Sequence, residues 1–258
     1  MSPAVITGMG VVSPYGFGVE AFRQGLHTGR SAVGPVQSFD VSTSPTQVAA
    51  EVPIEQITTS WVQERLSHIA NLSLPAEDIP KGMWRDRKVA FALLAAAEAW
   101  SQARCQPTDE VGCLSLALGL ELAFLEDFAP ILVDGEIDWD QALESKHTGV
   151  HLRSRADLAA QWVNRSLKLQ GSPTVHLSAC AAGTLAIGHA ASLIERGAAE
   201  LVITGGSDSM INPLGLGGMA RLSAPSPRHT ADACRPFDIR RDGLAMGEGA
   251  AIFVVESQ

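Results

Sequence analysis

The stretch TVHLSACAAGTLAIGHAASLIER, residues 174–196, decides the fold class of this chain. Residues 174–178 form a short run that favours a buried strand, and residues 181–196 have the length and composition of a helix that stops at Gly197. Cys180 stands at the junction between them. A strand that leads directly into a helix is typical of folds that alternate β and α elements.

Four more segments have the character of buried strands, and two more have the pattern of helices. The strands are residues 4–7, 111–118, 201–204 and 250–255, and the helices are residues 88–104 and 156–169. The order β-α-β-α-β-α-β-β predicts an α/β fold with a mainly parallel sheet and helices on both faces. Residues 40–83 and 120–150 are less regular, and we expect loops and short helices there. Nothing in the composition marks a boundary, so we expect residues 1–258 to form one domain.

The helix at 181–196 is apolar around most of its circumference. A surface helix has one apolar stripe, whereas a helix that is apolar nearly all round is covered on more than one side. One sheet covers only one of those sides. We therefore expect a partner layer on the other side, because an uncovered apolar face of this size favours aggregation.

The composition excludes several classes of function. The formal net charge of −9 argues against nucleic acid as the main partner, because phosphate binding needs a basic surface. The four cysteines lack zinc-ligand spacing, so no metal site is expected. The sequence shows no signal stretch and no run of eighteen apolar residues, so we expect a cytoplasmic protein that does not span a membrane.

Cys180 is the candidate nucleophile. Small residues flank it, and a tight turn between strand and helix leaves such a side chain projecting into free space. The positive end of a helix dipole stabilises a thiolate, and backbone N–H groups at the junction are candidate donors to an oxyanion. The alternative is that Cys180 is a small buried hydrophobic residue, as most free cysteines are. The residues alone leave both interpretations open.

The motif Ser178-Ala-Cys-Ala-Ala-Gly183 resembles the active-site motif of the β-ketoacyl-acyl carrier protein synthases, the elongating condensing enzymes of fatty acid and polyketide synthesis. The resemblance covers nearly the whole chain, in order and at plausible spacing. Its other landmarks are VITGMGVVSP at 5–14, WRDR at 84–87, GGSD at 205–208, LGLGG at 214–218, CRPFD at 234–238 and RDGLAMGEG at 241–249. In that family the last three runs line or brace the active site and the closing strand of the sheet.

The resemblance implies a thiolase-like fold, in which two βαβαβαββ units form a five-layer αβαβα sandwich. It implies that this chain is one unit, the N-terminal domain, without the C-terminal half. In that family two catalytic histidines and an active-site lysine belong to the second unit, and the seven histidines here do not match their positions. We interpret His176 and His189 as structural, since His189 lies about two and a half helical turns beyond Cys180.

The same resemblance implies that Cys180 is the acyl acceptor and that its substrate is a phosphopantetheine-linked acyl group on an acyl carrier protein. The chain itself is expected to bind no cofactor. The acyl pocket is expected to be lined by Ala179, Ala181, Gly183, Leu214, Gly217, Gly218 and Met219, with Gly183 permitting close packing at the junction. A basic group is expected to dock the carrier protein or, alternatively, to be an ordinary solvated helix start: Lys81, Arg85, Arg87 and Lys88.

Three weaker patterns have less specific explanations. Gly8 and Gly10 follow the first strand, but the third glycine and the acidic residue of a dinucleotide-binding fingerprint are missing. Residues 214–218 lack the Gly-Lys-Ser/Thr ending of a phosphate loop, and we interpret them as a loop that forms a wall of the active site. Four acidic residues are expected to brace loops rather than to act as an acid–base pair: Asp208, Asp238, Asp242 and Glu248.

Four interpretations of function follow. The favoured one is the N-terminal half of a split β-ketoacyl synthase, which needs a complementary C-terminal chain for condensation. The resemblance also implies a homo- or hetero-oligomer that pairs through the sheet edge beside the nucleophile strand. The second is an acyltransferase or thioesterase that uses Cys180 without condensation. The third is a non-catalytic scaffold or chain-length partner of a complete ketosynthase, against which the retained cysteine argues. The fourth is a fragment of a longer protein.

Overall fold

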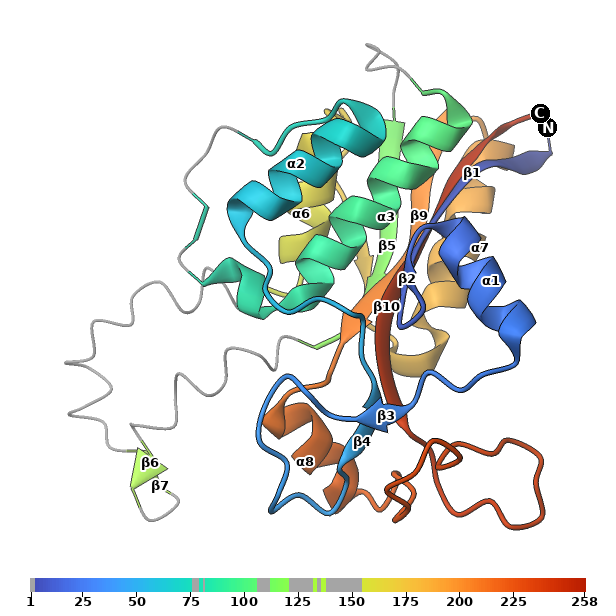
Figure 1. Cartoon of the computed structure of the whole chain (residues 1–258). Helices are drawn as coiled ribbons and strands as arrows, with labels where there is room; N and C mark the ends of the chain where they lie inside the picture. The colour runs from blue at the N-terminus through green and yellow to red at the C-terminus, as the bar shows by residue number, and fades with distance from the viewer. Residues whose placement is uncertain are drawn as a thin grey trace.

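A mixed β-sheet covered by helices organises the chain in the computed structural model, which describes residues 3–75, 79–80, 82–105, 112–120, 132–133, 136–137 and 155–258. Helices α2, α3 and α6 cover one face of the sheet, and α7 packs on the other (Figure 1). The sheet order is β2-β1-β10-β9-β5-β8, and β4, which pairs with β3, also pairs with β10. None of the described helices is long and apolar enough to span a bilayer.

The elements in the described ranges have the following bounds. The strands are β1 (Ala4–Ser13), β2 (Gly16–Phe17), β3 (Gly34–Pro35), β4 (Val48–Ala50), β5 (Gly112–Leu118), β6 (Leu132–Val133), β7 (Glu136–Ile137), β8 (Thr174–His176), β9 (Leu201–Ser209) and β10 (Met246–Ser257). The helices are α1 (Val19–Thr28), α2 (Thr59–Ala70), α3 (Arg87–Ala103), α6 (Leu158–Ser166), α7 (Ala182–Glu195) and α8 (Pro213–Arg221), with 3-10 turns η1 (Met83–Arg85) and η3 (Ala179–Ala181).

The predicted β-α-β-α-β-α-β-β order is confirmed by β1, α3, β5, α6, β8, α7, β9 and β10. Strands β5, β8 and β9 are parallel, and β10 runs antiparallel to its neighbours β1 and β9. Strands β1, β5, β8 and β9 therefore share one direction, as expected for a mainly parallel sheet. Val111, at the start of the predicted strand 111–118, lies outside the described residues.

Strands β1 and β9 are longer than predicted because they continue through glycines that interrupt the apolar pattern. A Cβ atom on Gly8 would stand 2.1 Å from the carbonyl oxygen of Ala99, and one on Gly10 would stand 1.9 Å from that of Ala95. These two glycines therefore let α3 pack directly on β1. Close packing accounts for the glycine pattern that superficially resembles a nucleotide-binding loop.

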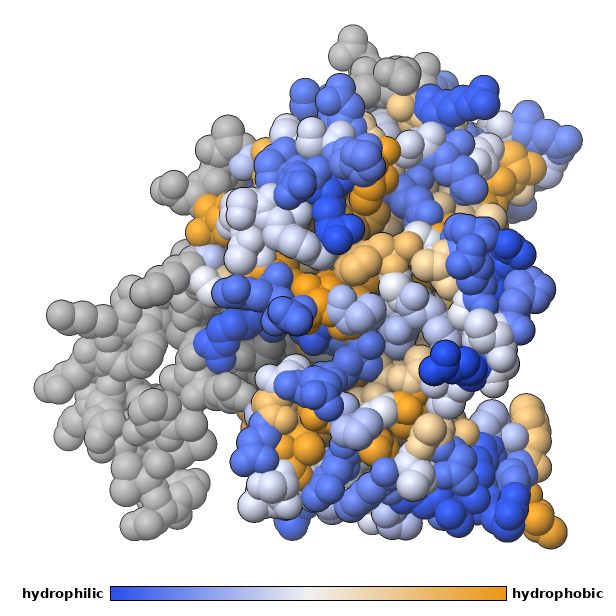
Figure 2. Space-filling view, viewed as in Figure 1, coloured by the Kyte–Doolittle hydropathy of each residue, from blue (hydrophilic) through white to orange (hydrophobic). Residues whose placement is uncertain are grey.

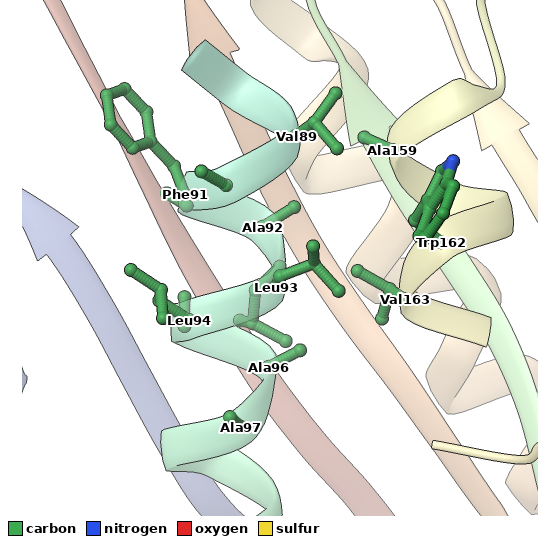
Figure 3. Packing of buried hydrophobic residues seen from close by; sticks show 14 of the residues in the cluster. Val89, Phe91, Ala92, Leu93, Leu94, Ala96, Ala97, Ala159, Trp162 and Val163 are labelled. Atoms are coloured by element: carbon green, nitrogen blue, oxygen red, sulfur yellow. The ribbon is translucent and has the colours of Figure 1, made fainter. Parts of the chain in front are cut away.

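The main core lies between the sheet and the helices α2, α3 and α6. Figure 3 shows Val89 and Leu93 of α3 pointing toward Ala159, Trp162 and Val163 of α6. All five residues are buried, and full burial of a side chain such as Val or Leu contributes about 1.5–3 kcal/mol. On the face shown in Figure 2, mostly hydrophilic residues lie over α1 and α2, so the outer sides of these helices meet solvent.

Candidate active site

Cys180 lies in the 3-10 turn η3, between the end of β8 and the start of α7. Its side chain is exposed. Ala179, directly before it, has a φ angle of 48°, in the left-handed region that residues other than glycine rarely adopt. The N–H of Ala181 donates a hydrogen bond of 3.2 Å to the carbonyl oxygen of Ser178 across the turn. The predicted junction is therefore present, and it holds an exposed thiol on a strained turn at a helix N-terminus.

The surroundings of the thiol are open. Residues 177–181 are all exposed. A Cβ atom added to Gly183 would meet no atom within 4 Å. The prediction that Gly183 permits close packing at the junction is therefore wrong for the described part of the chain, because this glycine faces open space there.

Helix α7 is covered on one side only. Its buried residues form a single stripe: Ala182, Ala186, Ala190 and Ile194. On its other side Leu185 is 49% exposed and Ile187 is 36% exposed, and Leu177 in the turn before it is 49% exposed. The prediction of an apolar helix that one sheet leaves half covered is confirmed for the described residues. Apolar surface thus extends along α7 from the turn that carries Cys180.

His176 and His189 contact the same buried side chain, Ser115 of β5. The Ser115 hydroxyl lies 2.9 Å from Nε2 of His176 and 3.0 Å from Nδ1 of His189. Partial burial lowers the pKa of His176, and the neighbouring charge of His189 lowers it further. Both rings therefore hold structural contacts, as predicted. Sequence reasoning missed Ser115, whose only signal is a lone hydroxyl residue within an apolar strand.

The segment 214–218 belongs to a helix, which corrects its interpretation as a loop. Helix α8 begins because Pro213 occupies its first turn and the side chain of Asn212 caps it, accepting a 2.8 Å hydrogen bond from the N–H of Gly215. Leu216 is buried in a small second core with residues of β4 and β10. Leu214 remains 41% exposed on the outer side. Of the predicted pocket residues, Ala179, Ala181 and Gly183 lie beside Cys180 in η3 and at the start of α7. The others lie on α8: Leu214, Gly217, Gly218 and Met219.

The predicted basic docking group is divided by burial. Lys88 is 1% exposed and forms an ion pair with the buried Asp86. Arg87 pairs with the buried Glu248 at 3.0 Å and also donates to the carbonyl oxygen of Val52 at 2.7 Å. The prediction that Lys88 docks a carrier protein is therefore corrected, since its charge is held inside the fold. Arg87 is half-buried, with 15% of its side chain exposed, and it lines an open groove, so its docking role stays a prediction.

The other two members of that group have different outcomes. Arg85 is exposed and lines an open groove of about 1290 Å³ between η1, the segment 32–57 and the start of α8. Lys81 lies outside the described residues. Cys180 does not line this groove, and neither do residues 214–219. The groove and the thiol are therefore separate features of the described surface.

Burial also changes the titration of the carboxylates that Arg87 and Lys88 face. Desolvation raises the pKa of Glu248, although the Arg87 charge opposes the shift. Desolvation likewise raises the pKa of Asp86 against the opposing charge of Lys88. The Ser209 hydroxyl donates to Glu248 at 2.6 Å, and the N–H of Val52 donates to it at 2.9 Å. Glu248 thus joins β10 to β9 and to the segment after β4, as expected for a bracing residue.

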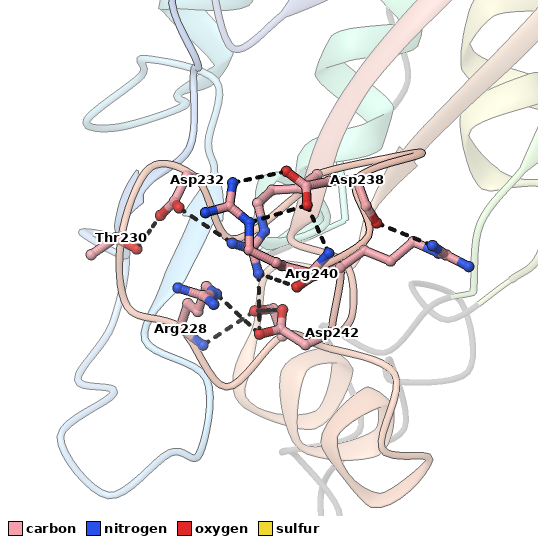
Figure 4. A network of polar contacts seen from close by, with 9 residues as sticks. Arg228, Thr230, Asp232, Asp238, Arg240 and Asp242 are labelled. Carbon is pink, nitrogen blue, oxygen red and sulfur yellow. Dashed lines mark hydrogen bonds and ion pairs between the residues drawn. The ribbon is translucent and has the colours of Figure 1, made fainter.

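A network of arginines and aspartates shapes the loop between α8 and β10 (Figure 4). Arg228 pairs with Asp242 at 3.0 Å, and Arg235 contacts the same carboxylate at 3.3 Å. Arg240 pairs with Asp238 at 3.1 Å within one tight turn. Hydrogen bonds to these groups lower the pKa of Asp238, chiefly from Arg240, and of Asp242, chiefly from Ser226. The expectation that Asp238 and Asp242 brace a loop is confirmed.

This braced loop holds two large apolar side chains in solvent. Phe237 is 99% exposed and Ile239 is 93% exposed.

Asp208, the remaining acidic residue of the set, is mostly buried at the end of β9, and burial raises its pKa while the Lys88 charge opposes the shift. Asp208 also leaves no room for a side chain on Gly119. None of these carboxylates contacts Cys180 in the described contacts.

Comparison with known proteins agrees with this architecture. The family model for the N-terminal domain of β-ketoacyl synthases matches residues 1–258. The chain is 33% identical over 259 residues to 3-oxoacyl-[acyl-carrier-protein] synthase 2 of Coxiella burnetii, covering 98% of this chain. The alignment covers 57% of that protein, so the chain spans little more than half the length of this curated relative.

Two solved structures have the same fold. A β-ketoacyl synthase from Burkholderia phymatum superimposes with a TM-score of 0.75 at 27% identity, covering all of this chain and 60% of that one. A type II polyketide ketosynthase, solved in complex with its acyl-carrier protein, superimposes with a TM-score of 0.76 at 24% identity, covering 99% of this chain and 58% of that one. The thiolase-like α/β fold expected from the sequence is therefore confirmed.

Proposed function

Because this chain belongs to the β-ketoacyl synthase family, through its N-terminal domain, we propose that Cys180 accepts an acyl group from an acyl carrier protein in fatty acid or polyketide synthesis. The observation that carries the proposal is the position of Cys180, which is exposed on a strained turn at the N-terminus of α7. Reactive cysteines occupy accessible sites of this kind, whereas structural cysteines are buried.

The proposed step is a thioester exchange. The sulfur of Cys180 attacks the carbonyl carbon of an acyl-phosphopantetheine thioester, and a new carbon–sulfur bond forms. The bond between that carbon and the phosphopantetheine sulfur then breaks, and the proton lost from Cys180 ends on the released carrier thiol. Backbone N–H groups of η3 are the proposed donors to the negative oxygen of the tetrahedral intermediate.

We further propose that a complementary ketosynthase half covers the exposed side of α7. Leu177, Leu185 and Ile187 supply the apolar surface that such a layer would bury. The family resemblance assigns two histidines and a lysine to that half. With them in place, the acyl group on Cys180 would condense with a malonyl unit, and loss of carbon dioxide would drive carbon–carbon bond formation. We propose that this half is a separate polypeptide.

The remaining proposed contacts concern carrier docking, the acyl pocket and assembly. Arg85, exposed beside the groove, is the charge retained from the predicted docking group, together with Arg87 and Lys81. Leu214, exposed on α8, is the retained candidate for a pocket wall, together with Gly217, Gly218 and Met219. Strand β8 is the edge of the sheet next to Cys180, and we propose that subunits pair there.

The experiment is the intact mass of the chain after incubation with an acyl-loaded carrier protein. Cys180→Ala is the test variant, and Cys234→Ala is the matched control because Cys234 is the other exposed cysteine. An acyl-sized increase that only Cys180→Ala abolishes supports the proposal. An increase that needs an added C-terminal half supports the split synthase. No increase with or without that half refutes acyl transfer and favours the scaffold interpretation.

A further inference from the structure

The buried hydroxyl of Ser115 joins the strand that enters the Cys180 turn to the helix that leaves it. We propose that Ser115 is a positioning residue for Cys180, acting through His176 and His189. The inference rests on the proposed role of Cys180 as acyl acceptor. It concerns three side chains of this chain that take no part in the thioester exchange described above.

Three contacts converge on this hydroxyl. Ser115, which is 0% exposed, lies at the middle of β5. Its oxygen is 2.9 Å from Nε2 of His176 at the end of β8 and 3.0 Å from Nδ1 of His189 on α7. It also lies 3.2 Å from the carbonyl oxygen of Ala186, to which it donates. One atom therefore contacts the last residue of β8 and two successive turns of α7.

The hydrogen bonds at this site determine which nitrogen of each histidine ring carries a hydrogen. A hydroxyl has one hydrogen to donate and two lone pairs that accept, and a carbonyl oxygen only accepts. With the Ser115 hydrogen on Ala186, both histidine nitrogens must carry hydrogens for all three contacts to be hydrogen bonds. His176 is therefore the Nε2–H tautomer and His189 is the Nδ1–H tautomer when each ring is neutral. These tautomers are a specific consequence of the geometry.

The position of Cys180 connects this arrangement to acyl transfer. The turn between His176 and α7 contains the strained φ angle of Ala179, and strain of this kind persists only where the surrounding contacts hold it. The turn itself is exposed, so few packing contacts hold it. Fixing His176 before the turn and Ala186 and His189 after it restricts where the thiol lies. A displacement of about 1 Å in a reacting group lowers rates by up to about a hundredfold.

Thr204 provides a matched control one strand away. It is paired in register with Ser115 on β9 and is also 0% exposed. Its hydroxyl is buried and has no hydrogen-bond partner among the residues that the structure describes. Thr204→Val therefore removes a buried hydroxyl at the same level of the sheet without breaking a hydrogen bond, whereas Ser115→Ala removes all three contacts.

The first readout is spectroscopic. In the ¹⁵N-histidine-labelled full chain at a pH where the rings are neutral, nitrogen shifts should identify His176 as Nε2–H and His189 as Nδ1–H. In Ser115→Ala neither ring should be held in a single tautomer, whereas Thr204→Val should leave both tautomers unchanged. The opposite tautomers in the wild-type chain would overturn the proposal.

The second readout is the rate of reaction at Cys180. Ser115→Ala should lower the acylation rate constant at saturating carrier protein by about tenfold and leave the half-saturating carrier concentration unchanged. Iodoacetamide alkylation of Cys180, followed by mass, should slow in the same variant. His176→Gln and His189→Asn place amide donors near the ring nitrogens that they replace, and they should retain most of the rate. His176→Leu and His189→Leu provide no donor and should lose most of the rate.

The two rate measurements separate this proposal from the proposed function. If the wild-type chain takes no acyl group with or without an added C-terminal half, the acyl-acceptor role fails, and alkylation together with the tautomers still tests the positioning role. Equal alkylation rates in Ser115→Ala and Thr204→Val would overturn the positioning role, whatever the acylation result. Equal loss in the Gln and Leu variants of His176 would also overturn it, because a donor at that position would then be irrelevant.

Discussion

Helices α3 and α7 are both rich in alanine and other apolar residues, yet the fold treats them differently. Helix α3 is buried over nearly its whole length, between the sheet and the helices α2 and α6. Helix α7 is buried along one stripe and exposes Leu185 and Ile187 on its other side. Similar sequences therefore have different environments, and the difference marks α7 as the surface that a further layer would cover.

The largest expected effect on the α3 side is the loss of its buried ion pair. Lys88→Met would leave the carboxylate of Asp86 buried without its cation, which we expect to lower the free energy of unfolding by about 3–5 kcal/mol. Urea denaturation measures this loss. Arg23→Met is the control, because Arg23 and Glu20 form an exposed pair, and its loss of stability should be much smaller. Equal losses of stability in Lys88→Met and Arg23→Met would contradict the expected difference between a buried and an exposed ion pair.

Glycine-to-alanine changes test the packing of the two helices. Gly10→Ala would force a methyl group against the carbonyl oxygen of Ala95 on α3, at an expected cost of about 1–3 kcal/mol or more. Gly188→Ala on α7 meets open space and should stabilise the helix by up to about 1 kcal/mol. Thermal unfolding of both variants measures the difference. A destabilising Gly188→Ala in the chain alone would show that this part of α7 is already covered.

Truncation of two leucines gives the same contrast for side chains. Leu93→Ala on α3 should cost about 2–5 kcal/mol, because Leu93 is 1% exposed and its loss leaves a cavity. Leu185→Ala on α7 should change stability by no more than about 0.5 kcal/mol in the chain alone. With a complementary half present, Leu185→Ala should weaken the association instead. A large cost of Leu185→Ala in the isolated chain would argue against an open face.

The smallest expected effect is the pH dependence that His176 contributes. Its pKa in the folded chain is lowered, chiefly by burial and then by His189, so the unfolded chain binds more protons between the two values. The stability contribution is therefore fully present above the unfolded pKa of about 6.5 and is lost as the pH falls through the folded value. His176→Gln should flatten the decline of the melting temperature between neutral and mildly acidic pH. An unchanged decline would contradict this assignment.

The candidate site was predictable where the signal is local. The motif around Cys180 places the thiol between a strand and a helix, and neighbouring residues alone define that junction. The basic residues before α3 show the limit of such reasoning. Arg87 and Lys88 look like surface charges in the sequence, but they pair with the buried carboxylates of Glu248 and Asp86. One of these partners is distant in sequence, and the other gives no sign of its burial.

The sequence by itself determined the order of strands and helices, the α/β class and the position of Cys180 between a strand and a helix, because hydrophobic periodicity and turn residues act over a few neighbouring positions. Only the tertiary structure decided which side of α7 is covered and which charges are buried. It also placed Ser115 between His176 and His189, residues more than sixty positions away in the chain. Such contacts depend on how strands pair across the sheet, and no local pattern encodes that pairing.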